Sequence, residues 1–321
     1  KISIADIAYF SPSLHGFQNV AIINGTFKGP LVDLRSKDFM MRYGDQTQIK
    51  GNFNITGLPE VDETFVFFDF TELITSISDI ESFPVPPYEA KQKLDLPSKL
   101  KQLGKIQYKG KFTGFFNDFV AYGKLRTNLG DLDSDLSIKQ DATSGATRFS
   151  GKLKTHDFNV GVLLDDTARI GRLSMNAGVN GRIDENSHML AFLDGEINSV
   201  DVLKYNYKNI IITGELSDEK FDGELKMQDH NIEMDFLGVI DFSTEKPIFD
   251  FTADIRNARL YNLNIDKRDS LANLSLMLTA NFTGASADRF RGKIEMFDLV
   301  YSTSKNNIAF NELSFQVKDE G

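Results

Sequence analysis

The feature that most constrains the fold is a strict alternation of apolar and polar residues, which is clearest between Asn231 and Phe242. Acidic residues such as Glu233 and Asp235 fall between the apolar positions. Because side chains alternate between the two faces of a strand, this spacing predicts a long strand with one apolar face. A glycine lies in the middle of that face, whose members are Ile232, Met234, Phe236, Gly238, Ile240 and Phe242.

The same pattern recurs along most of the chain as a loose unit, apolar-x-Gly-x-apolar. It is I-K-G-N-F around Gly51, Y-K-G-K-F around Gly110 and I-T-G-E-L around Gly214. A mid-strand glycine costs roughly 0.5–1 kcal/mol relative to alanine, so its repetition requires a structural gain. Glycine on an apolar face permits close approach of a backbone or a ligand, or sharp curvature of the sheet. The irregular spacing excludes a strict solenoid with one turn length.

These patterns predict an all-β fold, in which an elongated, curved antiparallel sheet folds into an open hydrophobic groove. We expect residues 1–321 to form a single such segment of a longer protein. The alternative is the core of a closed β-sandwich, because one-faced strands commonly pack on a second sheet. Glycines on the apolar face, strands of unusual length and a solvated polar face favour the groove.

The alternation stops between residues 71 and 104, where we expect a helical and proline-rich insertion. Leu73, Ile74, Ile77 and Ile80 have helical spacing, with Thr71 or Asp69 as the cap. The stretch 83–87 is rich in proline and ends that pattern. The sequence therefore predicts short helices near 71–82 and 159–164, and a helical turn or two between 97 and 103.

Charge and composition exclude several classes of function. The formal net charge is −10, which opposes binding to nucleic acid. There is no cysteine, so disulfides and thiolate metal sites are excluded. No apolar run is long enough for a transmembrane helix, so we expect any membrane anchor to lie outside this segment. The 27 phenylalanines and the absence of tryptophan favour an apolar surface without directed hydrogen bonds.

No catalytic or metal site emerges from the motifs. Asp131, Asp133 and Asp135 resemble the start of a calcium loop, but Leu136 stands where that loop requires glycine. The 4 histidines are scattered without ligand spacing, and no nucleophile or phosphate-binding motif is present. We therefore predict a protein that is not an enzyme and holds no metal or cofactor.

The motifs resemble those of a known family. The most specific run leads from Leu96-Pro97-Ser98-Lys99-Leu100 through Ile106-x-Tyr108-x-Gly110-x-Phe112-x-Gly114 to Asp118-Phe119-x-Ala121-x-Gly123-x-Leu125. Later come Phe158-x-x-Gly161-x-Leu163-Leu164, Tyr205-x-Tyr207-x-Asn209-Ile210-x-x-x-Gly214 and Leu260-x-x-Leu263. This pattern resembles a middle segment of the TamB and AsmA-like proteins of the Gram-negative envelope, and it covers most of the chain.

The resemblance implies a periplasmic β-groove, held by an inner-membrane anchor outside this segment and working at the outer membrane. Two roles follow from it. One is carriage of phospholipid between the two membranes. The other is assembly or secretion of outer-membrane proteins, as part of a translocation and assembly module with an outer-membrane β-barrel partner. A third possibility, from the residues alone, is a structural or adhesive surface β-domain.

Under the first role, the apolar face lines the groove and contacts phospholipid acyl chains. The polar face points to water, so a charge introduced on the apolar face is expected to obstruct passage. The lining residues expected from the alternation are Ile49, Phe53, Tyr108, Phe112, Phe119, Leu125, Met234, Phe236, Leu276, Leu278, Phe290 and Ile294.

Overall fold

The alternating segments form strands in the computed structural model, which describes residues 2–3, 20–58, 60, 63–82, 96, 98–141, 143–186, 188–217, 219–284 and 290–317. Strands make up most of the described residues, and helices only a small part. The all-β prediction is therefore confirmed. The chain divides into two units, Lys1–Thr167 and Ala168–Gly321. The prediction of one continuous segment over 1–321 stays a prediction.

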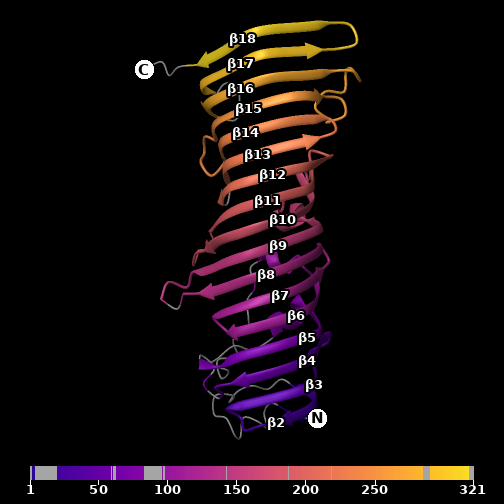
Figure 1. The fold of residues 1–321 in the computed structure, drawn as a ribbon, viewed down its shortest axis with the longest axis vertical. Coiled ribbons are helices and arrows are strands. Elements are labelled where there is room, and N and C mark those ends of the chain that lie inside the picture. Colours follow the sequence, from indigo (N-terminus) through magenta and orange to yellow (C-terminus); the bar gives the residue numbers. More distant parts are fainter. Residues whose placement is uncertain are drawn as a thin grey trace. The chain divides into compact units, whose positions relative to one another are not determined.

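Unit 1 is an antiparallel meander, in which each strand from β2 to β8 pairs with the next along the chain (Figure 1). The short β1 (Ile2–Ser3) pairs with β2. The remaining strands are β2 (Val20–Lys28), β3 (Asp33–Tyr43), β4 (Thr47–Thr56), β5 (Phe65–Ser76), β6 (Lys105–Phe115), β7 (Asp118–Thr127), β8 (Gly130–Gln140) and β9 (Thr147–Asn159).

Unit 2 repeats the same simple order, and each strand from β10 to β17 is antiparallel to its successor. Its strands are β10 (Ile170–Ile183), β11 (Met189–Val202), β12 (Tyr205–Ser217), β13 (Lys220–Asp229), β14 (Ile232–Asp241), β15 (Ile248–Arg259), β16 (Asn273–Thr283), β17 (Arg291–Ser302) and β18 (Asn307–Val317).

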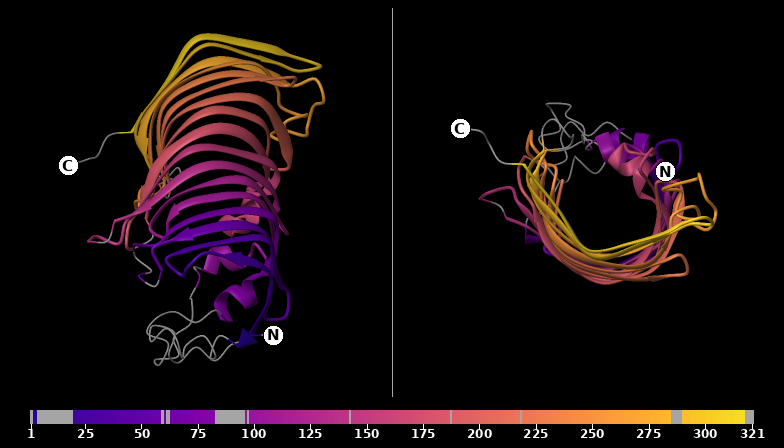
Figure 2. Two further views of the ribbon diagram at one scale, coloured as in Figure 1. Left: turned by 60° about the horizontal axis from the view of Figure 1, so that its bottom comes forward. Right: turned by 90° about the horizontal axis from the view of Figure 1, so that it is seen from above.

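The sheet of each unit is open and curved, as the sequence predicted. Seen from above, the strands of each unit bend so that one face is concave (Figure 2). Part of the bend comes from β-bulges, where an extra residue kinks one strand. Asp38, Asn257 and Asp298 occupy such bulges with φ angles of 54°, 53° and 49°. Asparagine and aspartate tolerate this left-handed backbone better than most other residues.

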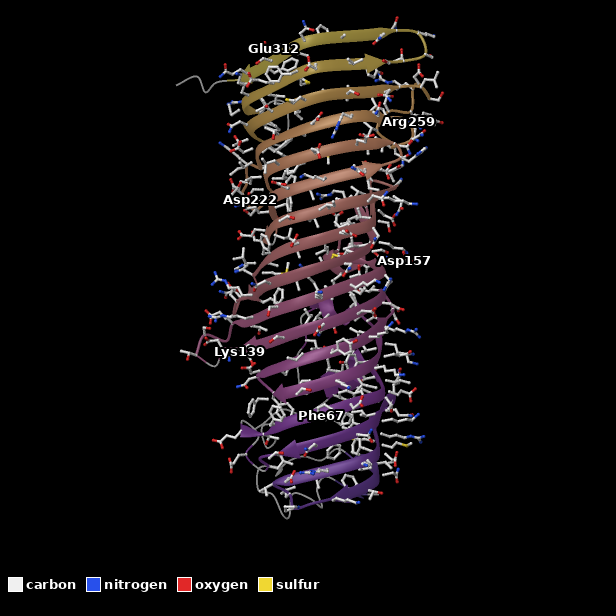
Figure 3. The ribbon with its side chains drawn as sticks, viewed as in Figure 1. Phe67, Lys139, Asp157, Asp222, Arg259 and Glu312 are labelled. Carbon is white, nitrogen blue, oxygen red and sulfur yellow. The ribbon has the colours of Figure 1, made fainter. Side chains whose placement is uncertain are left out.

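The two faces differ in polarity as the alternation requires. On β4, Gly51 and Phe53 are buried on the concave face, whereas Asn52 between them is exposed on the outer face. On β14, Phe236 is buried, while Glu233 and Asp235 are exposed. Figure 3 shows exposed charged side chains, Lys139, Asp222 and Glu312 among them, projecting from the strands.

The helix expected near 71–82 is shorter than predicted, and α2 covers only Ile77–Ser82. Residues 71–76 instead complete β5. A bulge between Phe70 and Leu73 shifts the alternation, so the apolar spacing imitates a helix. Neither Thr71 nor Asp69 caps the helix. The Ser76 hydroxyl accepts the Asp79 amide hydrogen bond at 3.2 Å.

Two further predicted helical segments are confirmed. Helix α3 (Ser98–Lys101) lies within the range expected for the insertion, near its end. Helix α4 (Val160–Leu164) follows β9, and the Asn159 side chain accepts a hydrogen bond from the Val162 amide. The proline-rich stretch 83–87 lies outside the described residues.

Glycines on the concave face bring neighbouring strands together and leave no space for a side chain. Gly110 and Gly123 pair directly across β6 and β7. A Cβ on Gly110 would lie 2.2 Å from the Tyr122 carbonyl oxygen and 2.6 Å from the Gly123 Cα. The same Cβ would lie 2.8 Å from the hydroxyl oxygen of Tyr108. These glycines therefore serve close backbone approach and curvature, because an aromatic residue occupies the space that they leave.

Candidate functional site

The candidate site is the concave apolar face of each unit. All the predicted lining residues lie on this face or, like Phe290, next to a strand that contributes to it. Phe53, Phe236 and Leu276 are buried, with exposures of 8%, 7% and 7%. The others are half-buried: Ile49, Tyr108, Phe112, Phe119 and Leu125 in unit 1, and Met234, Leu278, Phe290 and Ile294 in unit 2.

Two residues of the opening motif do not lie where the alternation would put them. Phe242 comes after the end of β14 and is 47% exposed in the turn. Asn231 is buried in the turn before the strand, within a hydrogen-bond network. Leu237, by contrast, follows the alternation and is 55% exposed on the outer face.

Aromatic rings form contact rows across the strands of the concave face. In unit 1 the ring centroids of Phe39 and Phe53 are 5.1 Å apart, and those of Phe53 and Phe68 are 5.8 Å apart. The rings of Phe112 and Phe119 stack at 4.6 Å. These distances fall within the range of favourable aromatic pairs. The sequence prediction included only part of this row and missed Phe27, Phe39, Phe68 and Phe70.

A second row crosses unit 2. The Phe236 and Phe251 rings are 5.1 Å apart, and Phe249 stacks on Phe282 at 4.6 Å. Phe282 is 4.9 Å from Phe290. The prediction named Phe236 and Phe290 but not the residues that lie between them. The signal available in the sequence was phenylalanine at alternating positions of adjacent predicted strands.

One edge of unit 1 is closed by helices, and we call it the packed rim. It comprises the β3–β4 turn, α2, α3, the β7–β8 turn and α4, and Figure 2 shows the helices gathered at one side. Backbone bonds join its parts: the Ile77 amide donates to the Gly104 carbonyl at 3.3 Å, and the Asn128 amide donates to the Leu103 carbonyl at 3.0 Å.

Asp79 pins α2 to this rim. Its carboxylate accepts hydrogen bonds from the amides of Asp45 (3.1 Å), Gln46 (2.8 Å) and Thr47 (2.7 Å), and from the Thr47 hydroxyl (2.7 Å). Burial by itself would raise the pKa of Asp79, but these bonds to the charged form outweigh it, so the pKa lies below its usual value. The carboxylate is 5% exposed and acts as a structural anchor.

Unit 2 has its own packed rim, made of the β11–β12 and β13–β14 turns and the loop between β15 and β16. Leu260, Leu263 and Ala272 of that loop are buried in the core cluster, with Leu263 only 1% exposed. The loop is tied to the turn by polar contacts. Asn262 donates to the Asn231 side chain at 2.8 Å, and Asn231 donates to the Tyr205 hydroxyl at 2.8 Å.

Tyr205 completes this network, because its hydroxyl donates to the Asp229 carboxylate at 2.5 Å. Burial and the bond to Asp229 raise the pKa of Tyr205. At the opposite edge of each unit, the described residues form no α-helix, and we call this edge the bare rim. The connections at this rim are β2–β3, β4–β5, β6–β7 and β8–β9 in unit 1, and β10–β11, β12–β13, β14–β15 and β16–β17 in unit 2.

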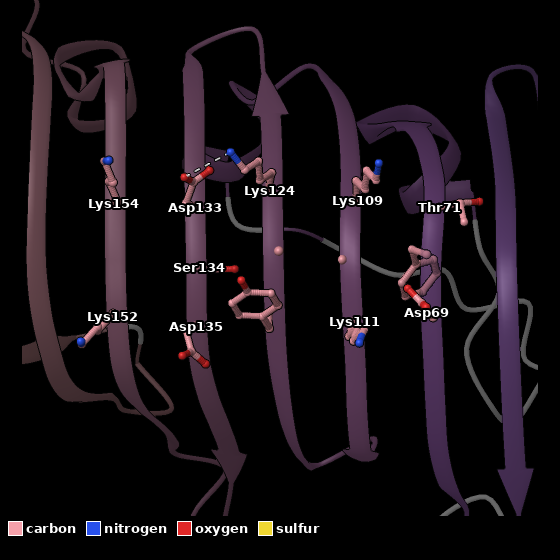
Figure 4. Close-up of a pocket in the computed structure, with 14 residues that line it drawn as sticks. Asp69, Thr71, Lys109, Lys111, Lys124, Asp133, Ser134, Asp135, Lys152 and Lys154 are labelled. Atoms are coloured by element: carbon pink, nitrogen blue, oxygen red, sulfur yellow. Dashed lines mark ion pairs between the residues drawn. The ribbon is translucent and has the colours of Figure 1, made fainter.

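A charged hollow lies on the outer face of unit 1, away from the concave face (Figure 4). Its walls include Lys109 and Lys124, which pair directly across β6 and β7, and Lys124 lies 3.8 Å from Asp133. The five lysines are interspersed with three aspartates, which offset part of the positive charge. Its charged side chains are Asp69, Lys109, Lys111, Lys124, Asp133, Asp135, Lys152 and Lys154.

The three aspartates that resemble a calcium loop lie within β8, on this outer face. Asp131 lies 3.5 Å from Arg126, and Asp133 lies 3.8 Å from both Lys124 and His156. Asp131 and Asp133 therefore each pair with a cationic side chain, Arg126 and Lys124. Across the part of the chain that the structure describes, no group of three His, Asp or Glu side chains is placed to bind a metal ion. None of the described helices is long and apolar enough to cross a membrane.

Comparison with known proteins adds no relative to this picture. No protein-family model, no curated protein and no solved structure matches the chain. The functional argument therefore rests on the residues and geometry described above.

Proposed function

We propose that the chain carries lipid, with the concave face of each unit holding acyl chains while headgroups stay in water. The single observation that carries this proposal is the row of half-buried apolar side chains on the concave face, such as Phe112, Phe249 and Phe282. The outer face is charged. A surface of this kind can hold alkyl chains along its whole length without directed hydrogen bonds.

The energetic reason is the cost of exposing alkyl chains to water. Burying one methylene group is worth about 0.8 kcal/mol, so a chain of about sixteen carbons costs on the order of 12 kcal/mol to hydrate. An aqueous path between two membranes is therefore prohibitive. A continuous apolar surface keeps the free energy of the chain nearly constant along the path.

The cellular setting belongs to the same proposal and rests on the resemblance to TamB and AsmA-like proteins. In that setting the chain is a non-enzymatic periplasmic bridge, anchored to the inner membrane by a segment outside residues 1–321. Its ligand is phospholipid, moved between the inner and outer membranes. The competing role is a scaffold for assembly of outer-membrane proteins.

Mass spectrometry of an organic extract of the natively purified protein tests the proposal. We expect phospholipid in near-stoichiometric amounts. Protein purified free of lipid, and unable to take up lipid from vesicles of phosphatidylethanolamine and phosphatidylglycerol, would refute the proposal. Co-purification of an unfolded outer-membrane barrel without lipid would favour the scaffold instead.

A further inference from the structure

The two halves of the concave face differ in what fills them. In unit 2, the half next to the packed rim is occupied by the protein itself. Val200, Ile210, Met227 and Ile232 pack with Leu263 of the rim loop, and each is less than a tenth exposed. The bonds of Asn262 and Tyr205 hold that loop in place. Space on this half is therefore taken by side chains of the chain.

The half next to the bare rim carries the aromatic row. Phe249, Phe282 and Phe290 lie at or next to the ends of β15, β16 and β17 that meet the bare rim, and all are half-buried. Their rings contact one another at 4.6 and 4.9 Å. Neighbouring strands are about 4.8 Å apart, so contacts between rings on successive strands make a strip that runs across the sheet.

Unit 1 shows the same division. Tyr43, Ile77, Leu129 and Phe158 are buried at its packed rim, with exposures of 5%, 9%, 7% and 4%. Its aromatic row begins at Phe27, which is 45% exposed beside the bare rim. The row continues through Phe39, Phe53 and Phe68, and Phe68 faces Phe112 across β5 and β6.

We propose that alkyl chains bind along the aromatic row beside the bare rim of each unit, and that the half beside the packed rim takes none. The inference rests on the proposed function and specifies where its ligand lies. It divides the predicted lining residues. Phe53, Phe112, Phe119, Phe236, Leu278, Phe290 and Ile294 fall on the aromatic side, whereas Ile49, Tyr108, Leu125, Met234 and Leu276 fall on the packed side.

The polarity of the row identifies an alkyl chain as its occupant. The strands beneath it already use their backbone groups in the ladders with their neighbours. An extended polypeptide laid along the row would bury N–H and C=O groups against phenylalanine rings without partners, and each unpaired group carries a penalty. An alkyl chain has no such groups and loses nothing against the rings.

Photo-crosslinking tests the inference in the whole chain. We would place p-benzoylphenylalanine at Phe249 or Phe282 on the aromatic side, and at Tyr207 or Leu274 on the packed side. All four side chains are half-buried, so they are matched in exposure. The purified variants are irradiated with vesicles of phosphatidylethanolamine and phosphatidylglycerol, and intact-mass spectrometry counts lipid adducts. Circular dichroism confirms that each variant is folded, and Phe251 and Tyr301 replace any position that fails.

We expect adducts at Phe249 and Phe282 to exceed those at Tyr207 and Leu274 by at least tenfold. Equal yields on the two sides, or a higher yield at the packed side, would overturn the inference and leave the proposed function standing. An absence of adducts at all positions, in protein whose organic extract contains no lipid, would overturn both. An absence of adducts in lipid-loaded protein would overturn the inference alone.

Discussion

The Asp79 anchor offers the sharpest test of how the packed rim is held. Asp79→Asn keeps the shape of the side chain but removes its charge and one accepting oxygen. In the native chain one oxygen accepts from Asp45, and the other accepts from Gln46 and from both groups of Thr47. An asparagine amide oriented to serve Gln46 and Thr47 turns its NH₂ group toward the Asp45 amide, which places donor against donor.

The magnitude follows from the bonds that change. Hydrogen bonds to a charged group contribute about 1.5–3 kcal/mol each, and one left unmade costs a similar amount. Loss of one bond and of the charge on the others should therefore lower the free energy of local opening by about 2–4 kcal/mol. Because 1.36 kcal/mol corresponds to a tenfold change in the equilibrium constant for opening, this loss corresponds to about 30- to 1,000-fold faster exchange of the protected amides.

Native-state hydrogen exchange with mass spectrometry measures this directly, in peptides that cover the β3–β4 turn and α2. Asp141→Asn is the matched control, because Asp141 also accepts amide bonds in a turn, from Thr143 and Ser144, but in an exposed loop. We expect little change near residue 79 in that variant. If Asp79→Asn speeds exchange at residues 45–47 by less than threefold, the carboxylate does not hold the rim and the reasoning fails.

Four further predictions follow from other contacts. Because the pKa of Asp79 is lowered on folding, its contribution to stability is present above the unfolded value near 3.8 and is lost as pH falls through the folded value. The protection of the amides of residues 45–47, measured relative to the intrinsic exchange rate at each pH, should therefore fall more between pH 5 and pH 3 in the native chain than in Asp79→Asn, and an equal fall would contradict this. Gly223→Ala places a Cβ 2.4 Å from the Thr213 carbonyl oxygen and should lower the free energy of unfolding, measured by urea denaturation, by about 1–3 kcal/mol. In Gly178→Ala the nearest atom lies at 3.6 Å, so this variant should be neutral or stabilising. Equal denaturation midpoints for the two variants would show that close strand approach is not the reason for Gly223. Tyr205→Phe removes the bonds to Asp229 and Asn231 and should cost about 1–3 kcal/mol, measured as faster exchange in the loop between β15 and β16, with Tyr207→Phe as the near-neutral control. Phe249→Glu should reduce co-purifying lipid several-fold and Lys109→Glu should not, since only the first puts a charge on the concave face. Phe249 is chosen over Phe236 and Leu276 because those side chains are each 7% exposed, and a charge there threatens folding. Unchanged lipid in a folded Phe249→Glu protein would count against the proposed lipid carriage.

The amino-acid sequence by itself determined the strands and the facing of their side chains. Because successive side chains of a strand point to opposite faces, each residue belongs to one of two faces. The inward direction of Ile49 and Phe53 therefore followed from the alternation of apolar and polar residues alone. The curved, open antiparallel sheet followed because many such strands are joined by short turns and few helices are available to cover them. The short apolar run from Phe158 to Leu164 also predicted α4, and the structure shows that Asn159 caps this helix.

Local pattern failed where an extra residue enters a strand. The bulge between Phe70 and Leu73 carries β5 through to Ser76, although Leu73 and Ile74 have the spacing of a helix. Asp38, Asn257 and Asp298 are likewise unremarkable polar residues in the sequence. Only pairing with a neighbouring strand shows that each is a bulge, because a bulge is a mismatch between two strands and not a property of one.

The tertiary structure alone decided which half of the concave face is filled. Asp79 binds residues 45–47, and Asn262 binds Asn231, contacts that join segments more than thirty positions apart in the chain. The same holds for the aromatic rows, in which Phe249 meets Phe282. Alternation tells which side chains face inward, but it carries no information on which loop folds back over them. That depends on burial and hydrogen bonding between distant segments, and the folded chain settles it at Leu263 and Asp79.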